Sequence, residues 1–209
     1  MGQPSISRID AQGTARAAVL VLHGGTPRSV APVTGTNLSW RRAGALQRAL
    51  AGQLRREGIA VWLLRYARRG WNDPGAPAPV QDARWALDRV REHDDLPIVL
   101  VGHSMGARTG ARVADDPSVL GLVGLAPWFP PGEPVGALRG KDLVVAHGRR
   151  DRITSFAASQ DFVRRAGSVA RSTEFHDMGM VGHYLLREIG AWNGLAAGSV
   201  RGMLVHDRA

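Results

Sequence analysis

Short apolar runs alternate along this chain with segments in which apolar and polar residues follow a helical spacing. Five runs are continuously apolar and bounded by glycine, proline or polar residues, a pattern typical of strands buried on both faces of a parallel sheet. These runs are Ala17–Leu22, Ile59–Leu64, Ile98–Val101, Val119–Leu125 and Leu143–Ala146. The pattern therefore predicts a parallel sheet at the centre of the fold.

Helical spacing occupies most of the sequence between those runs. The predicted helices are Trp40–Glu57, Val80–Glu92, Met105–Ala114, Ser155–Ala166 and His183–Ala196. Alternating strands and helices predict an α/β fold, a doubly wound and mostly parallel sheet of about six or seven strands with helices on both faces. Arg171–Asp177 is expected to add one of these strands, and Ser5–Asp10 an antiparallel strand at the edge.

Length and composition favour one domain. The 209 residues, 44% of them apolar, suit one filled core, and no linker or internal repeat divides them. We therefore expect residues 1–209 to form a single domain. The chain has no cysteine, which excludes disulfides, thiolate metal sites and thiol catalysis. The apolar runs fall short of the ~18 residues of a spanning helix, and the first residues do not resemble a secretion signal. We expect a cytoplasmic protein without a membrane partner.

The charge is strongly positive but dispersed. The net charge of +9 arises from 27 basic residues against 18 acidic ones, and Lys141 is the only lysine. The arginines occur singly or in pairs, whereas nucleic-acid surfaces usually cluster basic residues and interleave them with aromatic ones. We therefore expect no nucleic-acid partner, although the positive field would attract anionic substrates. The sequence does not indicate the oligomeric state.

A serine stands between two glycines where the third apolar run gives way to a predicted helix. The sequence there is Gly102-His103-Ser104-Met105-Gly106, and Gly-x-Ser-x-Gly at a strand-to-helix turn is the nucleophile-elbow arrangement. The turn strains the backbone of the serine, and side chains at the two glycine positions would collide with the neighbouring strand and helix. We predict that Ser104 is a catalytic nucleophile at a helix N-terminus, where the dipole favours a developing anion.

The loop after the first parallel run supplies candidate donors for that anion. Its sequence is LHGGT, residues Leu22–Thr26, and backbone N–H groups in this position complete an oxyanion hole. One donor is expected to be the amide of Met105, which follows the nucleophile. The other is expected to be the amide of Gly24 or Gly25, and the sequence does not discriminate between them.

An acid and a base should follow the serine, in the chain order Ser, acid, His. Asp151 follows the fifth apolar run after a short turn, which places its carboxylate on the same edge of the sheet as Ser104. Asp142 precedes that run and should lie at the opposite edge, and Asp161 falls inside a predicted helix. Glu133, which follows the preceding run, remains the alternative acid.

His183 is the best placed of the seven histidines to be the base. It follows Arg171–Asp177 after a loop that contains glycine, and it is predicted to begin the last helix. His23, His103 and His147 lie beside strand ends or inside motifs, and we expect them to be structural hydrogen-bonding residues. The others lie within a strand or on surface helices.

The motifs LHGG, GHSMG, HGRRD and GHY occur in that order, and between Ala17 and Trp192 the chain resembles the α/β-hydrolase family. The resemblance implies that Ser104 is the nucleophile, Asp151 the acid and His183 the base, with oxyanion donors at Met105 and at Gly24 or Gly25. Family members with a lid usually insert it before the strand that delivers the acid. Here Trp128–Asp142 has only 15 residues, so no cap domain is expected.

The predicted activity is that of a small serine hydrolase that cleaves carboxylic esters through an acyl-enzyme intermediate, without a cofactor or metal. The motif GHSMGA also resembles thioesterases, so an acyl thioesterase is the alternative enzyme. A non-catalytic binding protein on the same fold is the alternative of another class. Without a cap, loops at the carboxyl edge must form the substrate site. We expect a shallow pocket for short or medium acyl chains, lined by Trp71, Trp128, Phe129, Met178 and Met180.

Overall fold

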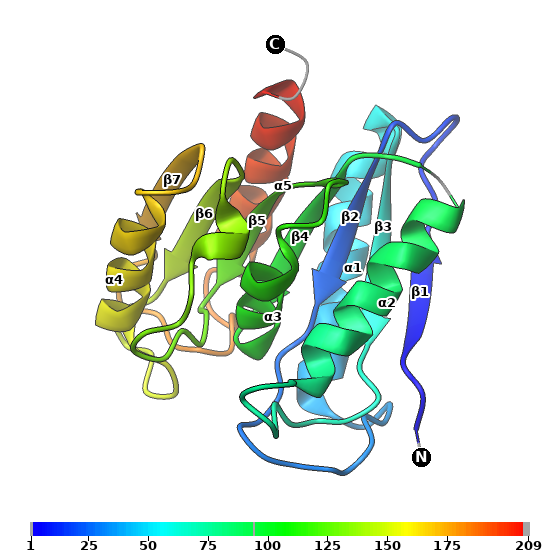
Figure 1. Ribbon diagram of the computed structural model, residues 1–209. Coiled ribbons are helices and arrows are strands. Elements are labelled where there is room, and N and C mark those ends of the chain that lie inside the picture. Colours follow the sequence, from blue (N-terminus) through cyan, green and yellow to red (C-terminus); the bar gives the residue numbers. More distant parts are fainter. Residues whose placement is uncertain (1, 94, 207–209) are drawn as a thin grey trace.

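The computed structural model describes residues 2–93 and 95–206, which form a twisted sheet with helices on both faces (Figure 1). Residues 1, 94 and 207–209 of the predicted domain lie outside the described part. Within it the sheet has seven strands in the order β1-β3-β2-β4-β5-β6-β7. They are β1 (Ser5–Ile9), β2 (Ala17–Leu22), β3 (Ile59–Arg65), β4 (Ile98–His103), β5 (Val119–Leu125), β6 (Asp142–His147) and β7 (Ser172–Asp177).

Strand pairing confirms the predicted α/β fold. β1 runs antiparallel to β3 at one edge, as the sequence predicts, and every other neighbouring pair is parallel. The helices that cover the sheet are α1 (Leu38–Leu54), α2 (Ala78–His93), α3 (Met105–Val113), α4 (Phe156–Ala166) and α5 (Ile189–His206). No described helix is long and apolar enough to cross a membrane.

The core has two layers because successive residues of a strand point to opposite faces. On β2, Leu20 and Leu22 belong to the cluster that includes α2, α3 and α4. Val19 and Val21 belong to the cluster that includes α1 and α5. Figure 1 shows this division, with α2 and α3 in front of the sheet and α1 and α5 behind it. Burial on both faces explains why the strands appear in the sequence as continuous apolar runs.

The predicted bounds of the last helix, His183–Ala196, are wrong at both ends. His183 lies in the loop between β7 and α5, and the helix begins at Ile189 and continues to His206. Leu185 and Glu188 have φ of 53° and 56°, and such left-handed residues interrupt a helix. The loop between β5 and β6 contains a 3-10 turn at Gly136–Leu138 and no α-helix, so the expected absence of a cap there is confirmed.

Candidate active site

Ser104 lies at the sharp turn between β4 and α3. Its backbone angles are φ 56° and ψ −118°, a strained conformation for a residue with a side chain. A Cβ atom at Gly102 would overlap the backbone of Ala107, and one at Gly106 would overlap the carbonyl group of Leu22. The two glycines therefore let β4, α3 and β2 meet closely enough to hold this turn. The serine side chain lines a small cavity at the carboxyl edge of the sheet.

Asp151, just beyond β6, is held by a dense set of hydrogen bonds. Its Oδ2 lies 2.7 Å from His183 Nδ1, 2.8 Å from Thr154 Oγ1 and 3.0 Å from His147 Nε2. Its Oδ1 accepts from the backbone amides of Ile153 and Thr154, at 2.7 and 2.8 Å. Burial alone would raise the pKa of Asp151, but the hydrogen bonds, from His147 and His183 first, outweigh it and hold that pKa well below the usual range. The carboxylate is therefore charged and fixed in orientation.

His183 connects this carboxylate to the cavity that contains Ser104. Its buried ring contacts Asp151 through Nδ1, and its carbonyl oxygen lies 3.0 Å from His103 Nε2. When Nδ1 carries the proton donated to Asp151, Nε2 has a free lone pair and can accept one. Ser104 and His183 line the same cavity. Within the described residues no direct hydrogen bond joins them, and such contacts commonly tighten only when substrate binds.

The predicted oxyanion donors surround the serine. Gly24 and Gly25 line the cavity together with Ser104, and Met105 is the first residue of α3, whose amide has no acceptor inside the helix. The loop is anchored by His23, whose Nδ1 donates to the carbonyl oxygen of Gly24 at 2.6 Å while Nε2 accepts from the amide of Tyr66 at 3.2 Å. Burial lowers the pKa of His23 to about 4, so the ring is neutral and can hold both contacts.

The alternative acids lie elsewhere and have other partners. Glu133 is buried between Arg108 and Arg112 of α3. Asp142, at the start of β6, lies at the opposite edge of the sheet and forms an ion pair with Arg171. Asp161 is part of α4 and pairs with the arginines at 164 and 165. The carboxylate that contacts His183 is that of Asp151.

The residues expected to line the substrate site lie outside the cavity at Ser104. Trp71 is 2% exposed and Phe129 is 3% exposed, so both belong to the core. Arg108 explains the position of Trp71 and Trp128, because its guanidinium carbon lies 3.9 and 4.5 Å from their ring centroids, a cation–π arrangement. Met180 is exposed, and Met178 packs against the core. None of the five lines the cavity at Ser104.

That cavity has a volume of about 120 Å³, and it adjoins a larger groove of about 380 Å³. Leu38 and Arg42 of α1 line both. The apolar residues that do line the cavity are Leu38, Ile153 and Tyr184. Sequence reasoning missed them because Leu38 precedes the predicted helix and the other two lie in irregular loops. Ile153 stands among polar residues that carry no periodic signal, and Tyr184 falls inside the helix predicted at His183–Ala196.

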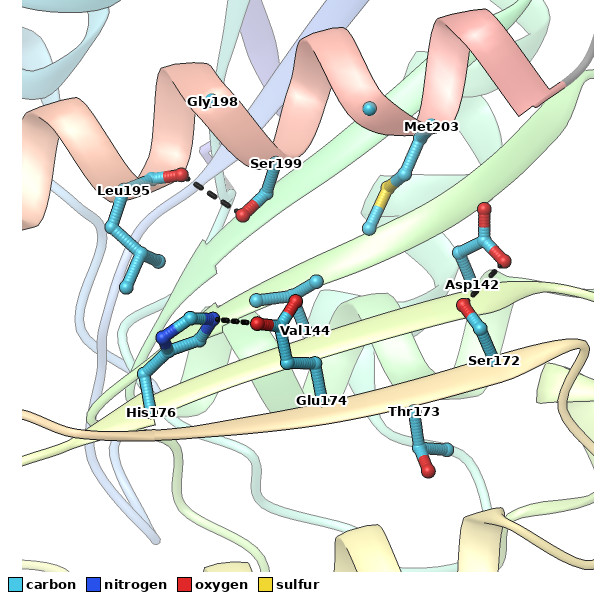
Figure 2. A pocket seen from close by; sticks show the side chains of 11 residues that line it. Asp142, Val144, Ser172, Thr173, Glu174, His176, Leu195, Gly198, Ser199 and Met203 are labelled. Carbon is cyan, nitrogen blue, oxygen red and sulfur yellow. Dashed lines mark hydrogen bonds and ion pairs between the residues drawn. The ribbon is translucent and has the colours of Figure 1, made fainter.

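A further cavity lies away from the serine. It measures about 560 Å³ and lies between β7 and α5 (Figure 2). In Figure 2, Glu174 and His176 rise from β7 towards the helix and contact each other at 2.8 Å. None of Ser104, Asp151 or His183 lines it. Within residues 2–93 and 95–206, no cluster of three or more His, Asp or Glu residues could hold a metal ion.

Comparison with known proteins agrees with this fold. A model described as the alpha/beta hydrolase family matches residues 19–205. No curated protein sequence matches the chain. Among solved structures, an alpha-beta serine hydrolase homologue from Coxiella burnetii is 21% identical, with a TM-score of 0.70 over 95% of this chain and 92% of that one.

Two further structures have the same fold. An α/β serine hydrolase without a lid from Xanthomonas campestris is 20% identical, with a TM-score of 0.71 over 95% of this chain and 88% of that chain. Est1E from Butyrivibrio proteoclasticus, solved with ferulic acid bound, is 11% identical, with a TM-score of 0.71 over 97% of this chain and 96% of its own. With the family model covering most of its length, the chain belongs to the α/β-hydrolase family.

Proposed function

We propose that this protein is a serine hydrolase that cleaves carboxylic esters through a Ser104–His183–Asp151 triad. The observation that carries the proposal is the 2.7 Å contact between Asp151 and His183 beside a cavity that both His183 and the strained Ser104 line. A nucleophile, a base and a charged group that orients the base are the components of acyl transfer. All three lie at the carboxyl edge of the sheet, where α/β folds bind ligands.

The reaction begins when His183 Nε2 accepts the proton of the Ser104 hydroxyl as its oxygen attacks the acyl carbon. The amides of Met105 and of Gly24 or Gly25 stabilise the oxyanion of the tetrahedral intermediate. The intermediate collapses when the C–O bond to the alcohol breaks, and His183 protonates the departing oxygen. Water then attacks the acyl-enzyme by the same steps and releases the carboxylic acid and free Ser104.

The small cavity favours short or medium acyl chains. Its volume of about 120 Å³ holds only a few carbon atoms, so methylenes beyond it would lie on an open surface and gain only part of the ~0.8 kcal/mol that full burial of each supplies. The short connection between β5 and β6 offers no lid for an interface to open. We therefore expect no jump in rate when the substrate passes from monomers to aggregates.

A panel of 4-nitrophenyl esters and the matching thioesters, assayed with the wild type and Ser104→Ala, tests the proposal. We expect kcat/KM for the oxygen esters to peak at short or medium acyl length and to disappear in the variant. A clear preference for the thioesters would assign the alternative thioesterase activity to the same triad. If neither class is hydrolysed, or if the variant retains activity, the proposed function is wrong.

A further inference from the structure

Arg42 is a cation in the catalytic cavity, and no carboxylate of the described residues forms an ion pair with it. It lies on α1, lines the cavity with Ser104 and His183, and has its guanidinium carbon 5.4 Å from the ring centroid of Tyr184. Its Nη1 is buried and has no hydrogen-bond partner among the described residues. Burial lowers the pKa of Arg42. Burial is also the main cause that lowers the pKa of His103, and the charge of Arg42 adds to it.

Two other arginines that are partly withdrawn from water have acidic partners. Arg108 forms an ion pair with the buried Glu133, and Arg91 forms one with the buried Asp116. Such pairing is the general rule, because removing a charge from water costs free energy that only an opposite charge or hydrogen bonds can offset. Arg42 therefore carries an uncompensated cost of desolvation, which an anionic ligand in the cavity would relieve.

The adjoining groove indicates what else the ligand carries. Beyond Leu38 and Arg42, apolar side chains of α1 and of the chain around the start of α5 line it, namely Leu46, Leu185, Leu186 and Ile189. Arg41, Arg48 and Asn193 also line the groove. Leu38, Leu186 and Ile189 are 73%, 67% and 52% exposed. Exposed large apolar residues that gather at one place mark a binding surface. The groove thus extends the catalytic cavity with an apolar surface, and Arg42 lies at the junction.

We propose that Arg42 is a specificity-determining residue that binds a carboxylate of the substrate. The substrate class is an ester that carries this carboxylate near the scissile bond and an apolar portion that lies in the groove. The planar guanidinium matches a carboxylate through two parallel hydrogen bonds. The inference rests on the proposed ester hydrolysis, and it adds the charge of the substrate to that activity.

Matched substrates test this role. On the acyl side, the mono-4-nitrophenyl ester of glutaric acid is compared with 4-nitrophenyl pentanoate, which has the same chain length without the charge. On the alcohol side, the butanoyl ester of 4-hydroxybenzoate is compared with that of its methyl ester. Each pair is assayed with the wild type, Arg42→Gln, Arg42→Lys and the control Arg28→Gln. Arg28 is exposed in the loop after β2 and lines none of the cavities described above.

In Arg42→Gln, we expect kcat/KM for the charged ester of at least one pair to fall by about 10- to 100-fold, mainly through KM, because a hydrogen bond to a charged group contributes ~1.5–3 kcal/mol. Its neutral counterpart should change less than about threefold. Arg42→Lys should restore part of the loss because it restores the charge without the planar fork. Arg28→Gln should leave both ratios unchanged.

The proposal is overturned if Arg42→Gln lowers charged and neutral esters equally in both pairs, or if Arg28→Gln has the same effect as Arg42→Gln. A Tm within a few degrees of the wild type separates loss of recognition from loss of fold, and Arg42→Lys repeats the test if the glutamine variant unfolds. If the wild type hydrolyses neither ester of either pair, the proposed function itself fails. If the wild type hydrolyses the charged and neutral esters and Arg42→Gln affects them equally, only this inference is refuted.

Discussion

The two sides of the catalytic cavity differ in how firmly their side chains are held. On one side, Asp151 has five hydrogen-bonding contacts, and the rings of His147 and His183 are buried. On the other side, Arg42 has a buried nitrogen that no described residue bonds, and Leu38 and Tyr184 are largely exposed. The first side consists of groups that position one another, and the second consists of groups that face solvent.

This difference separates chemistry from recognition. A catalytic group must be preorganised, because its contribution depends on orientation within a fraction of an ångström. A group that recognises substrate gains its partner only on binding, so it can remain incompletely paired beforehand. Substitutions on the firmly held side should therefore lower kcat. Substitutions on the exposed side should change KM and the choice of substrate.

The largest effect should follow from removing the nucleophile. Ser104→Ala should lower kcat by about 10⁴-fold or more, because no other group forms the acyl-enzyme. The fold should persist, since the substitution removes only a hydroxyl that lines the cavity. Steady-state ester hydrolysis and thermal unfolding measure the two consequences. More than a few per cent of residual activity would refute the nucleophile assignment.

The acid and the base should act as one unit. Asp151→Asn and His183→Ala should each lower kcat by roughly 10³-fold or more, and the double variant should be little worse than the more impaired single one. Independent losses that multiply would contradict a shared triad. Glu133→Gln is the matched test of the alternative acid. If Glu133→Gln were inactive and Asp151→Asn had normal activity, Glu133 would be assigned as the acid in place of Asp151.

The buried neutral histidines should make the fold sensitive to acid. Burial lowers the pKa of His23 to about 4 and that of His103 to about 3. Below about pH 6.5 these two histidines bind protons in the unfolded chain but remain neutral in the folded protein. Each therefore lowers the free energy of unfolding by up to ~1.4 kcal/mol per pH unit. The free energy of unfolding is unaffected by these two groups above about pH 6.5, and it decreases as the pH falls towards 4.

Denaturant unfolding at several pH values between 7 and 4.5 measures this loss. His23→Gln should reduce the slope of unfolding free energy against pH by about one proton. Asp151 does not contribute in this window, because its lowered pKa means that its stabilisation is lost only below about pH 4. An unchanged slope in His23→Gln would contradict the assignment of a neutral buried ring.

His147 should act on catalysis through Asp151 as a positioning residue. Its Nε2 lies 3.0 Å from Asp151 Oδ2, and its Nδ1 lies 2.8 Å from Ser159 Oγ. His147→Leu should lower kcat by roughly tenfold with little change in KM, because a hydrogen bond to a charged acceptor is lost. His147→Gln, which keeps an N–H donor at a similar reach, should recover part of that rate. An equal change in both variants would indicate a purely packing role.

The smallest effect is expected on the exposed side. Leu186→Ala, in the groove, should raise KM about two- to fivefold for an ester whose apolar portion is long enough to reach it, since each lost methylene removes ~0.8 kcal/mol at most. The kcat should remain unchanged, and so should the kinetics of a short ester. A fall in kcat with the short ester would show that the groove also supports the catalytic groups.

Most of the fold could be predicted from the sequence because both faces of the sheet are buried. The apolar runs are continuous for that reason, and the strands at Ala17–Leu22 and Val119–Leu125 agree with their predicted bounds. The final helix could not be placed because its start depends on Leu185 and Glu188, which adopt left-handed conformations that no local pattern indicates.

The substrate side of the site was the least predictable. The turn at Ser104 could be predicted from its two flanking glycines, because the turn tolerates no side chain at those positions. By contrast, the sequence alone does not show that Trp71 packs against Arg108 instead of lining a pocket. The burial of Arg108 in turn depends on its ion pair with Glu133, which is 25 residues away in the chain. Long-range ion pairs of this kind leave no periodic trace in the sequence.

Covalent labelling tests the central claim most directly. A fluorophosphonate reacts with an activated serine, and digestion followed by mass spectrometry identifies the modified residue. We predict one adduct per chain, on the peptide that contains Ser104, with much slower labelling in His183→Ala and none in Ser104→Ala. An adduct on another residue, or equally fast labelling of the folded His183→Ala variant, would contradict the triad.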